Sequence, residues 1–489
     1  MRVNQNDKAV ESYYHLAGQD LDRKKCQGLA CFVARYENPE RWLEATSQSH
    51  RIHCLGKCYM APASASDDQR PRVEVRSRFP LVLKRIAEGG ARSFSVYTRA
   101  GGYIALRSAF DRGPDEIVRE VELSGLRGRG GAGFPTGKKW RAVLGEPSPE
   151  KFVVANADEG DPGAYIDRFI IEDDPHALVE GMVIAGYAVG AKKGYVYLRA
   201  EYPQARTVLE EAILEARRNG VLGERILGTD FGFDIEIVIG HGSYVCGEET
   251  ALLNSIEGRR PEVRARPPYP TSEGQWGKPT LVNNVETLAN IPWIVHNGGI
   301  PYATFGTATS KGTKVISLNS LFNRPGLYEI EFGVSVRHIV EELGGGLKVG
   351  SLNGVIIGGP LAGVIPPSLL DTSFGFDELD AIGASVGHGG VVAFDEHTSI
   401  AELMHHVFDF GAFESCGKCT PCRLGSREIE RMFWNVIEDG QAPAGKRTEF
   451  EEVTTALALT SLCGHGSGLA EFARSISRYY PEQLRSCFA

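Results

Sequence analysis

The chain has 489 residues, of which 42% are hydrophobic, and a formal net charge of −9. This length predicts about three domains with ordinary globular cores. The acidic balance excludes nonspecific nucleic-acid binding, which needs a basic face, and no run of about 18 apolar residues predicts a membrane span.

Cysteines are the first feature along the chain. Cys26 and Cys31 have the spacing C-x4-C, and Cys54 and Cys58 have the spacing C-x3-C. A polar stretch at 61–72 follows and predicts a linker. A chain of this length does not need disulfide staples, and its ten cysteines are clustered, so a secreted disulfide scaffold is excluded. The polar N-terminus has no apolar core of a secretory signal, so we expect reduced thiols in the cytoplasm.

Residues 102–310 alternate between predicted helices and strands. This pattern predicts a parallel-rich α/β sheet with ligands bound at the loops that follow the strands. Apolar periodicity predicts helices beginning near 114 and 174 and spanning 204–219, and strands at 152–155, 195–198 and 234–239.

A glycine-rich loop at 125–140 contains G-x-G-x-x-G at Gly128, Gly130 and Gly133. Glycines let backbone N–H groups approach a phosphate, and a nearby lysine adds positive charge. A predicted helix precedes the loop, and Phe134-Pro135-Thr136 interrupts the helix that should follow, so an ordinary dinucleotide fingerprint is not expected. The loop predicts a phosphate site, with a surface turn as the alternative.

Three further loops, at 156–163, 244–250 and 283–287, carry carboxylates and side-chain amides. The first follows a predicted strand, where α/β sheets bind ligands, although its composition also fits a metal loop or a solvated turn. Glu248 and Glu249 in the second could only stabilise the N-terminus of the next helix. The adjacent amides of Asn283 and Asn284 suit a polar ring.

The C-terminal third changes character twice. Residues 311–395 contain short apolar runs, many glycines and one helix near 336–343, which predicts a small α+β domain. Residues 396–489 are predicted to be mostly helical, with a cysteine loop between two helices.

That loop has the strongest motif of the chain. Cys416, Cys419 and Cys422 have C-x2-C-x2-C spacing, and Cys463 is a distant fourth thiol, which suits a 4Fe–4S cluster. Structural zinc sites usually pair two short C-x2-C hairpins, so zinc is the weaker alternative. Two cysteine sets, a phosphate loop and amide-rich loops together suggest a flavin between a hydride donor and one-electron acceptors.

Residues from about 97 to 475 resemble the NADH-binding flavoprotein subunit of respiratory complex I. The matching strings lie at 124–140, 156–168, 244–258, 277–288, 414–425 and 461–463. The N-terminal set, with Cys54-Leu55-Gly56-Lys57-Cys58 and Ala61-Pro62, resembles the thioredoxin-like 2Fe–2S domain of the partner subunit, although the gap between Cys31 and Cys54 is shorter here. Such a fusion is similar to the beta (diaphorase) subunit of NAD-dependent formate dehydrogenases and to the diaphorase subunit of NAD-reducing nickel–iron hydrogenases.

This resemblance implies a multidomain α/β protein. The implied parts are a thioredoxin-like 2Fe–2S domain at 1–75, a connector at 76–101, a Rossmann-like FMN- and NADH-binding domain at 102–310, a small ubiquitin-like α+β domain at 311–395, and a helical 4Fe–4S domain at 396–489.

The resemblance also implies residue roles. The residues implied for FMN are Gly128, Gly130 and Lys139, which would hold its phosphate, and Asn156, Asp158, Tyr244, Gly247, Glu248, Asn283, Asn284 and Thr287, which would line the flavin. Those implied for NAD are Phe134, Asp161, Glu249, Arg266 and Tyr269, and Glu249 would repel a 2′-phosphate and favour NAD over NADP. Asp161, Arg266 and Tyr269 stand where complex I usually has Glu, Lys and Phe. The cluster ligands would be Cys416, Cys419, Cys422 and Cys463 for 4Fe–4S, and Cys26, Cys31, Cys54 and Cys58 for 2Fe–2S.

The implied activity is that of a diaphorase subunit, which moves hydride between NAD and FMN and single electrons to or from iron–sulfur clusters without a catalytic nucleophile. We first expect a molybdenum or tungsten formate dehydrogenase, with an alpha catalytic subunit and a small 2Fe–2S subunit as partners. An NAD-reducing hydrogenase or a respiratory complex I is the alternative. A non-catalytic iron–sulfur or zinc module is an alternative of another class, but it predicts no flavin site.

Overall fold

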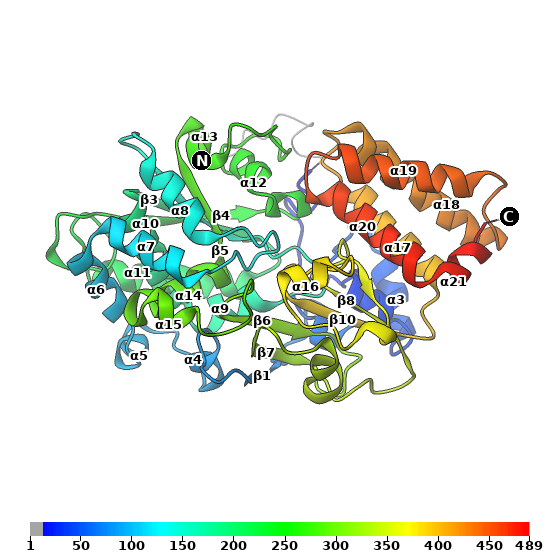
Figure 1. Ribbon diagram of the computed structural model, residues 1–489, viewed down its shortest axis with the longest axis horizontal. Coiled ribbons are helices and arrows are strands. Elements are labelled where there is room, and N and C mark those ends of the chain that lie inside the picture. The colour runs from blue at the N-terminus through cyan, green and yellow to red at the C-terminus, as the bar shows by residue number, and fades with distance from the viewer. Residues whose placement is uncertain (1–12, 489) are drawn as a thin grey trace.

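A computed structural model describes residues 13–488, so the first twelve residues of the predicted N-terminal domain and Ala489 lie outside the described residues. Figure 1 shows an α/β body around strands β2 to β5, a helical body of α17 to α21 opposite it, and a second sheet below and between them. Among the described residues, no helix is long and apolar enough to cross a membrane.

The α/β body is built on a four-stranded parallel sheet of order β4-β3-β2-β5. Val153, Val154 and Ala155 in β2 are fully buried, as expected for a strand covered by helices on both faces. Three of the strands were predicted, and the short strand β5 was missed. The strands are β2 (Phe152–Ala157), β3 (Lys193–Arg199), β4 (Asp234–Gly240) and β5 (Thr280–Asn284).

Helices cover this sheet, and the predicted ones are confirmed within a residue or two. Helix α10 packs against both β2 and α14, and nearly all of its side chains are buried. The helices of this body are α6 (Ile104–Arg112), α7 (Pro114–Ser124), α8 (Thr136–Gly145), α9 (Ile166–Asp173), α10 (Pro175–Val189), α11 (Pro203–Arg218), α12 (Glu249–Ile256), α13 (Pro270–Glu273), α14 (Val285–Asn297) and α15 (Gly299–Tyr302). The predicted connector contributes α4 (Lys84–Ala87) and α5 (Phe94–Arg99).

The small domain contains a mixed six-stranded sheet of order β1-β7-β6-β10-β8-β9. One edge strand, β1 (Arg72–Val75), comes from the predicted N-terminal domain and pairs in parallel with β7. The predicted domain boundary at residue 75 therefore separates β1 from the sheet to which it belongs. The other elements are β6 (Thr313–Leu318), β7 (Gly326–Glu331), β8 (Leu352–Ile357), β9 (Val364–Ile365), β10 (Gly390–Asp395), the π-helix η5 (His338–Leu343) and α16 (Phe376–Asp380).

Residues 13–71 differ from the thioredoxin-like prediction. They form helices α2 (Leu29–Val33) and α3 (Pro39–Thr46), the turn η1 (Cys58–Met60) and an isolated bridge, with no sheet of their own in this described segment. The segment is buried against the rest of the chain instead: Phe32 stacks on His406 at 4.2 Å, and Arg35 lies 2.9 Å from Glu402. The short chain between its cysteine pairs holds only α3 and loops, so its apolar face needs an outside partner.

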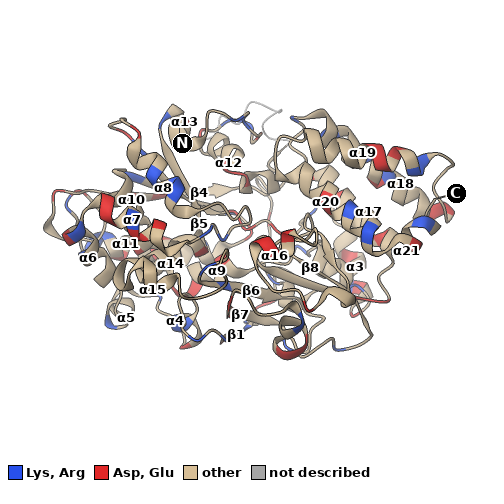
Figure 2. Ribbon diagram, viewed as in Figure 1, with Lys and Arg blue, Asp and Glu red and all other residues tan. Residues whose placement is uncertain are grey.

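The helical body follows the prediction for 396–489. Ser399 and Glu402 form a capping box that starts α17, and the cysteine loop lies between α17 and α18, with Cys422 in η7. Both signs of charge alternate along these outer helices, as Figure 2 shows, and many are paired within three or four residues. The elements are α17 (Ile400–Phe413), η7 (Pro421–Gly425), α18 (Ser426–Asp439), α19 (Lys446–Thr460), α20 (Gly464–Tyr479) and α21 (Pro481–Ser486).

Candidate functional site

The carboxyl ends of β2, β4 and β5 open onto one cavity of about 840 Å³. This is the edge at which parallel α/β sheets bind ligands, and the volume suits a cofactor together with a second ligand. Loops of the small domain and the first turns of α20 close the other side. Three parts of the chain that are far apart in sequence therefore share the cavity wall.

The glycine-rich loop forms one wall of the cavity. Its motif glycines, Gly128, Gly130 and Gly133, all precede α8, so the helix does not begin at them. A Cβ added to Gly130 would lie 2.8 Å from Cβ of Asn284, so the backbone runs closer to its neighbour than a side chain allows. The Arg129 backbone N–H donates to Oγ1 of Thr287 at 2.8 Å, which fixes the loop from behind. A glycine backbone fixed in the cavity wall lets its N–H groups approach the phosphate of a flavin nucleotide.

Side-chain amides at the strand ends are oriented by neighbouring groups. Asn156 Nδ2 donates to the Gly247 carbonyl at 2.8 Å, and Trp140 Nε1 donates to Oδ1 of Asn283 at 2.8 Å. An amide has both a donor and an acceptor atom, so each of these side chains keeps hydrogen-bonding capacity for a ligand. Both amides and that of Asn284 line the cavity, which fits the polar ring predicted for this site.

Three half-buried acidic residues, Asp158, Asp161 and Glu248, line the cavity. Oδ2 of Asp158 is buried and has no hydrogen-bond partner among residues 13–488, and burial raises the pKa of Asp158 to about 8. Oδ1 of Asp161 accepts a hydrogen bond of 2.6 Å from the Tyr244 hydroxyl. Glu248 caps α12 by accepting from Thr250 N–H at 2.9 Å. An orphaned polar atom in a residue that lines the cavity indicates a missing hydrogen-bonding partner.

The rim combines aromatic rings with a charged pair. Phe134 is 51% exposed and Tyr269 is 56% exposed, which is unusual for rings of this size and leaves their faces available for stacking. Glu249 lies 2.9 Å from Lys139 and 3.1 Å from Arg266. Burial opposes ionisation, but these two cations outweigh it and hold the pKa of Glu249 below its usual value. Glu249 is therefore a carboxylate at neutral pH.

All but one of the predicted flavin and nucleotide residues lie in the cavity wall. Thr287 is fully buried and supports the glycine loop rather than lining the cavity. Sequence reasoning missed the opposite wall, which carries no motif of its own. Its residues are Gly358, Leu361, Ala362, Gly363, Asp380, Gly383, Ala384, Ser385, Gly387 and His388 from the small domain, and Gly464, His465, Ser467, Gly468 and Glu471 from α20.

The C-terminal thiols meet as predicted. Cys416, Cys419, Cys422 and Cys463 line one small apolar pocket together with Val245 and Leu462. Burial raises the pKa of Cys422 to about 12 and that of Cys463 to about 11, so a metal must displace protons to bind there. Four thiols around an apolar pocket fit a 4Fe–4S cluster.

The N-terminal thiols also gather in one buried place. Cys54 Sγ lies 3.8 Å from Cys58 Sγ, and Cys26, Cys31, Cys54 and Cys58 belong to the same core cluster. Backbone N–H groups of Gly28, Gly56 and Ala63 donate to three of these sulfurs at 3.3 to 3.4 Å. N–H···S contacts of this kind tune iron–sulfur clusters, so the set fits 2Fe–2S.

The C-terminal thiol set borders the large cavity directly, whereas the N-terminal set borders a neighbouring small cavity. Cys463 lines the cavity as well as the cluster pocket. On another side, Cys54 borders a small polar cavity shared with Asp158, Gly160 and Tyr244, which also line the large one. The other two cysteines, Cys246 and Cys487, are also buried, and neither belongs to a set of neighbouring thiols among the described residues.

Comparison with known proteins agrees with this geometry. A family model for the Nuo51 FMN-binding domain matches residues 121–293, and a model for the NADH-ubiquinone oxidoreductase-F iron-sulfur binding region matches residues 402–487. The NADP-reducing hydrogenase subunit HndC of Solidesulfovibrio fructosivorans is 45% identical over 76% of this chain and 76% of its own. A subunit of the NADH-quinone oxidoreductase of Rhizobium meliloti is 42% identical over 82% of this chain and 96% of its own.

A solved structure extends the similarity to the N-terminal segment. The crystal structure of an NAD+-reducing [NiFe]-hydrogenase in the H2-reduced state contains a chain that covers 98% of this one, with 87% of its own length, a TM-score of 0.83 and 30% identity.

Proposed function

This chain belongs to the family of NADH-binding FMN flavoproteins that occur in complex I and NAD-reducing hydrogenases, and we propose that it is the NAD-specific diaphorase subunit of a multi-subunit oxidoreductase. One observation carries the proposal: the cavity that gathers the glycine loop, the amides and the exposed aromatic rings is bordered by Cys463 of the cluster set. Hydride and electron sites therefore share a wall.

The proposed roles follow from position. The glycine loop and the amides of Asn283 and Asn284 hold a flavin nucleotide at the strand ends, while Phe134 and Tyr269 stack on the rings of the dinucleotide at the rim. When bound, FMN accepts hydride from nicotinamide and passes electrons singly to the clusters.

Glu249 sets the choice of nucleotide in this proposal. A carboxylate held ionised by Lys139 and Arg266 accepts ribose hydroxyls and repels a 2′-phosphate, which favours NAD over NADP. HndC is described as part of an NADP-reducing enzyme, so similarity in sequence does not decide this point, and the carboxylate carries the argument.

The relatives named above are subunits of hydrogenases and of a quinone oxidoreductase. They favour one of these assemblies, which was the alternative in the sequence analysis, over the formate dehydrogenase first expected. A formate dehydrogenase with an alpha catalytic subunit is the finer hypothesis from the sequence, but the fused cysteine segment does not separate it from a hydrogenase, because both resemblances include that segment. Mass spectrometry of the natively purified complex distinguishes them, because a molybdopterin subunit, a nickel subunit or quinone-reductase subunits would co-purify.

The direct test uses the full chain purified without oxygen. We expect about six iron atoms, from one 4Fe–4S and one 2Fe–2S cluster, and one FMN per chain. NADH should bleach the visible spectrum, whereas NADPH should have little effect. Zinc without flavin would contradict the proposal, and about four irons with FMN would remove the N-terminal cluster while keeping the function.

A further inference from the structure

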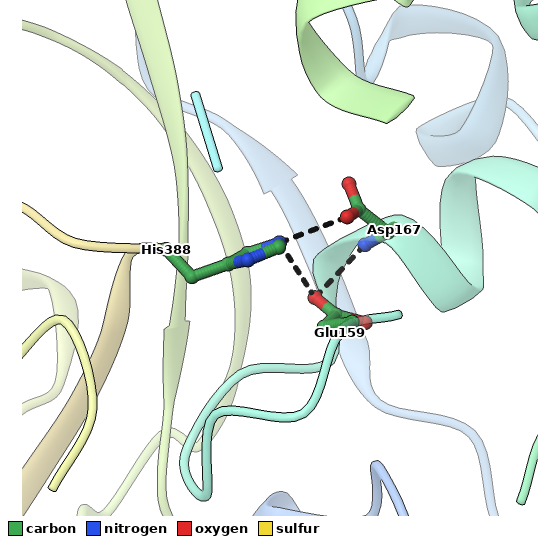
Figure 3. A group of neighbouring side chains, drawn as sticks. All are labelled: Glu159, Asp167 and His388. Carbon is green, nitrogen blue, oxygen red and sulfur yellow. Dashed lines mark hydrogen bonds and ion pairs between the residues drawn. The ribbon is translucent and has the colours of Figure 1, made fainter. Parts of the chain in front are cut away.

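A buried charged triad of Glu159, Asp167 and His388 is shown in Figure 3. Glu159 and Asp167 belong to the string 156–168, whereas His388, which lines the cavity, belongs to no motif. Nε2 of His388, on the loop before β10, lies 2.9 Å from Oδ2 of Asp167 in α9 and 3.3 Å from Oε1 of Glu159, which follows β2. Glu159 is fully buried, Asp167 is 1% exposed and His388 is 6% exposed. The triad joins the small domain to the α/β body.

Both carboxylates are held in place by donors from the protein. Glu159 accepts from the backbone N–H of Asp167 at 3.0 Å and of Arg168 at 3.2 Å. Oδ2 of Asp167 also accepts from Nδ2 of Asn284 at 2.6 Å. Burial, and then the charge of Asp167, raise the pKa of Glu159 to about 7, and its backbone donors together with His388 oppose that rise. The charges of the two carboxylates in turn favour the protonated imidazole between them.

The protonation of His388 agrees with this arrangement. Burial alone would lower its pKa, but the charges of Asp167 and Glu159 outweigh burial and raise the pKa of His388 to about 9. Two other charged groups face it: Asp161, whose ionisation it favours, and Lys314, which opposes its protonation. Lys314 is itself paired with Glu286. His388 is therefore an imidazolium through neutral pH.

The backbone places this imidazolium next to the glycine loop. Gly131 and Gly387 form an antiparallel bridge, so His388, the residue after Gly387, lies next to the glycine-rich loop. His388 lines the cavity, as do Gly130, Gly131 and Asn284. Because Asp167 binds both Asn284 and His388, these side chains and the glycine loop form one continuous wall.

The other cations at the cavity are less suited to neutralise a ligand at this wall. Lys138 and Arg266 are exposed, and Lys139, the lysine first assigned to the phosphate, is paired with Glu249 at 2.9 Å. The guanidinium of Arg129 points away, donating to the Lys311 carbonyl at 2.7 Å and the Tyr302 hydroxyl at 3.0 Å. Nε2 of His388 faces the two carboxylates at ion-pair distance but outside hydrogen-bond geometry, and Nδ1 has no hydrogen-bond partner among residues 13–488, which leaves its N–H to donate to a ligand.

We propose that His388 is a phosphate ligand of FMN, donating a charge-assisted hydrogen bond from Nδ1–H to the phosphate held at the glycine loop. This inference rests on the proposed function, because it needs FMN in the cavity. A phosphate monoester carries a charge of about −1.5 to −2 at neutral pH, so backbone N–H groups alone leave much of it unpaired. Asp167 and Glu159 act as positioning residues that hold the ring and its charge.

The test compares FMN with riboflavin, which has the same ring system but no phosphate. The flavin-free full chain is titrated with each flavin, and quenching of flavin fluorescence gives the two dissociation constants. For His388→Gln we expect the FMN dissociation constant to rise about 10- to 100-fold, the loss typical of one hydrogen bond to a charged group, while the riboflavin constant changes less than about 3-fold. His397→Gln is the matched control, since this exposed histidine also lies near a carboxylate, Asp395, at 3.0 Å.

Each outcome decides the inference. An equal loss of both flavins in His388→Gln, or no loss of FMN, would overturn it. If wild-type chain bound neither flavin, the proposed function itself would fail, so the two failures are distinguishable. If circular dichroism showed that the variant did not fold, the pH dependence of the wild-type chain would be measured instead. Its preference for FMN over riboflavin should fall at least about 5-fold as pH rises from 7.5 to about 10, because His388 loses its proton. An unchanged preference would overturn the inference.

Discussion

Nζ of Lys139 lies 2.9 Å from Oε2 of Glu249, which joins the helix after the glycine loop to the helix that follows β4 across the mouth of the cavity. Arg266 contacts the other oxygen of the same carboxylate at 3.1 Å. The resemblance implied Lys139 for the phosphate of FMN and Glu249 for NAD, as separate roles. The structure instead makes them one charged unit, which has consequences for nucleotide choice.

Replacing Glu249 with glutamine should relax nucleotide specificity. We expect the KM for NADH to rise about 10-fold and the ratio of NADH to NADPH activity to fall by at least that factor, because the repulsion of a 2′-phosphate is lost. Steady-state reduction of ferricyanide with each nucleotide measures this. Glu273→Gln, on the exposed surface of α13, is the control, and an unchanged specificity ratio in Glu249→Gln would reject the role.

Replacing Cys463 with serine should remove the C-terminal cluster and leave the flavin. We expect iron to fall by about four atoms per chain, because one ligand of the 4Fe–4S set is lost, while FMN and its bleaching by NADH persist. Iron analysis and visible spectra of the anaerobic protein provide the measurement. Cys487→Ser is the matched control, since Cys487 is buried but donates only to the Gln483 carbonyl among the described residues. Equal iron content in both variants would contradict the assignment.

Replacing Lys314 with methionine should destabilise the contact between the small domain and the α/β body. Lys314 in β6 and Glu286 in α14 form a fully buried ion pair, so removing one partner leaves an unpaired charge. We expect the free energy of unfolding to fall by about 3–5 kcal/mol, measured by urea denaturation. Adding Glu286→Gln should recover much of the loss. Arg206→Met, which breaks an exposed pair with Glu210, should cost less than about 1 kcal/mol.

Asp158 should make the stability of the flavin-free chain fall with rising pH. Burial raises its pKa to about 8, whereas an unfolded aspartate titrates near about 3.9, so between these values the folded state holds a proton that the unfolded state has lost. The free energy of unfolding therefore decreases as pH rises through this interval. Asp158→Asn should show a flatter decline between pH 5 and about 8 in urea melts, while Asp230→Asn, at a fully exposed site, should match wild type. Parallel curves for wild type and Asp158→Asn would contradict this.

Local features were predictable because their chemistry depends on residues close in sequence. The C-x2-C-x2-C loop and the interruption at Phe134 before α8 appear where expected, and the strand predicted at 152–155 is β2 (Phe152–Ala157). The thioredoxin-like fold of the N-terminal segment was wrong for the described residues, because its resemblance rested on cysteine spacing and spacing does not specify a sheet. Strand β1 was missed because its edge pairing with β7 joins residues more than 250 positions apart.

The two cysteine sets and more than half of the cavity-lining residues of the α/β body could be predicted from sequence. The opposite wall, the pairing of Lys139 with Glu249, and the position of His388 between Asp167 and Glu159 became apparent only in the folded structure. The physical reason is that a motif fixes which groups lie within a few residues of one another. The partner of a buried charge depends on how elements that are distant in sequence pack together. In this chain that packing brings His388 of the small domain against two carboxylates of the α/β body.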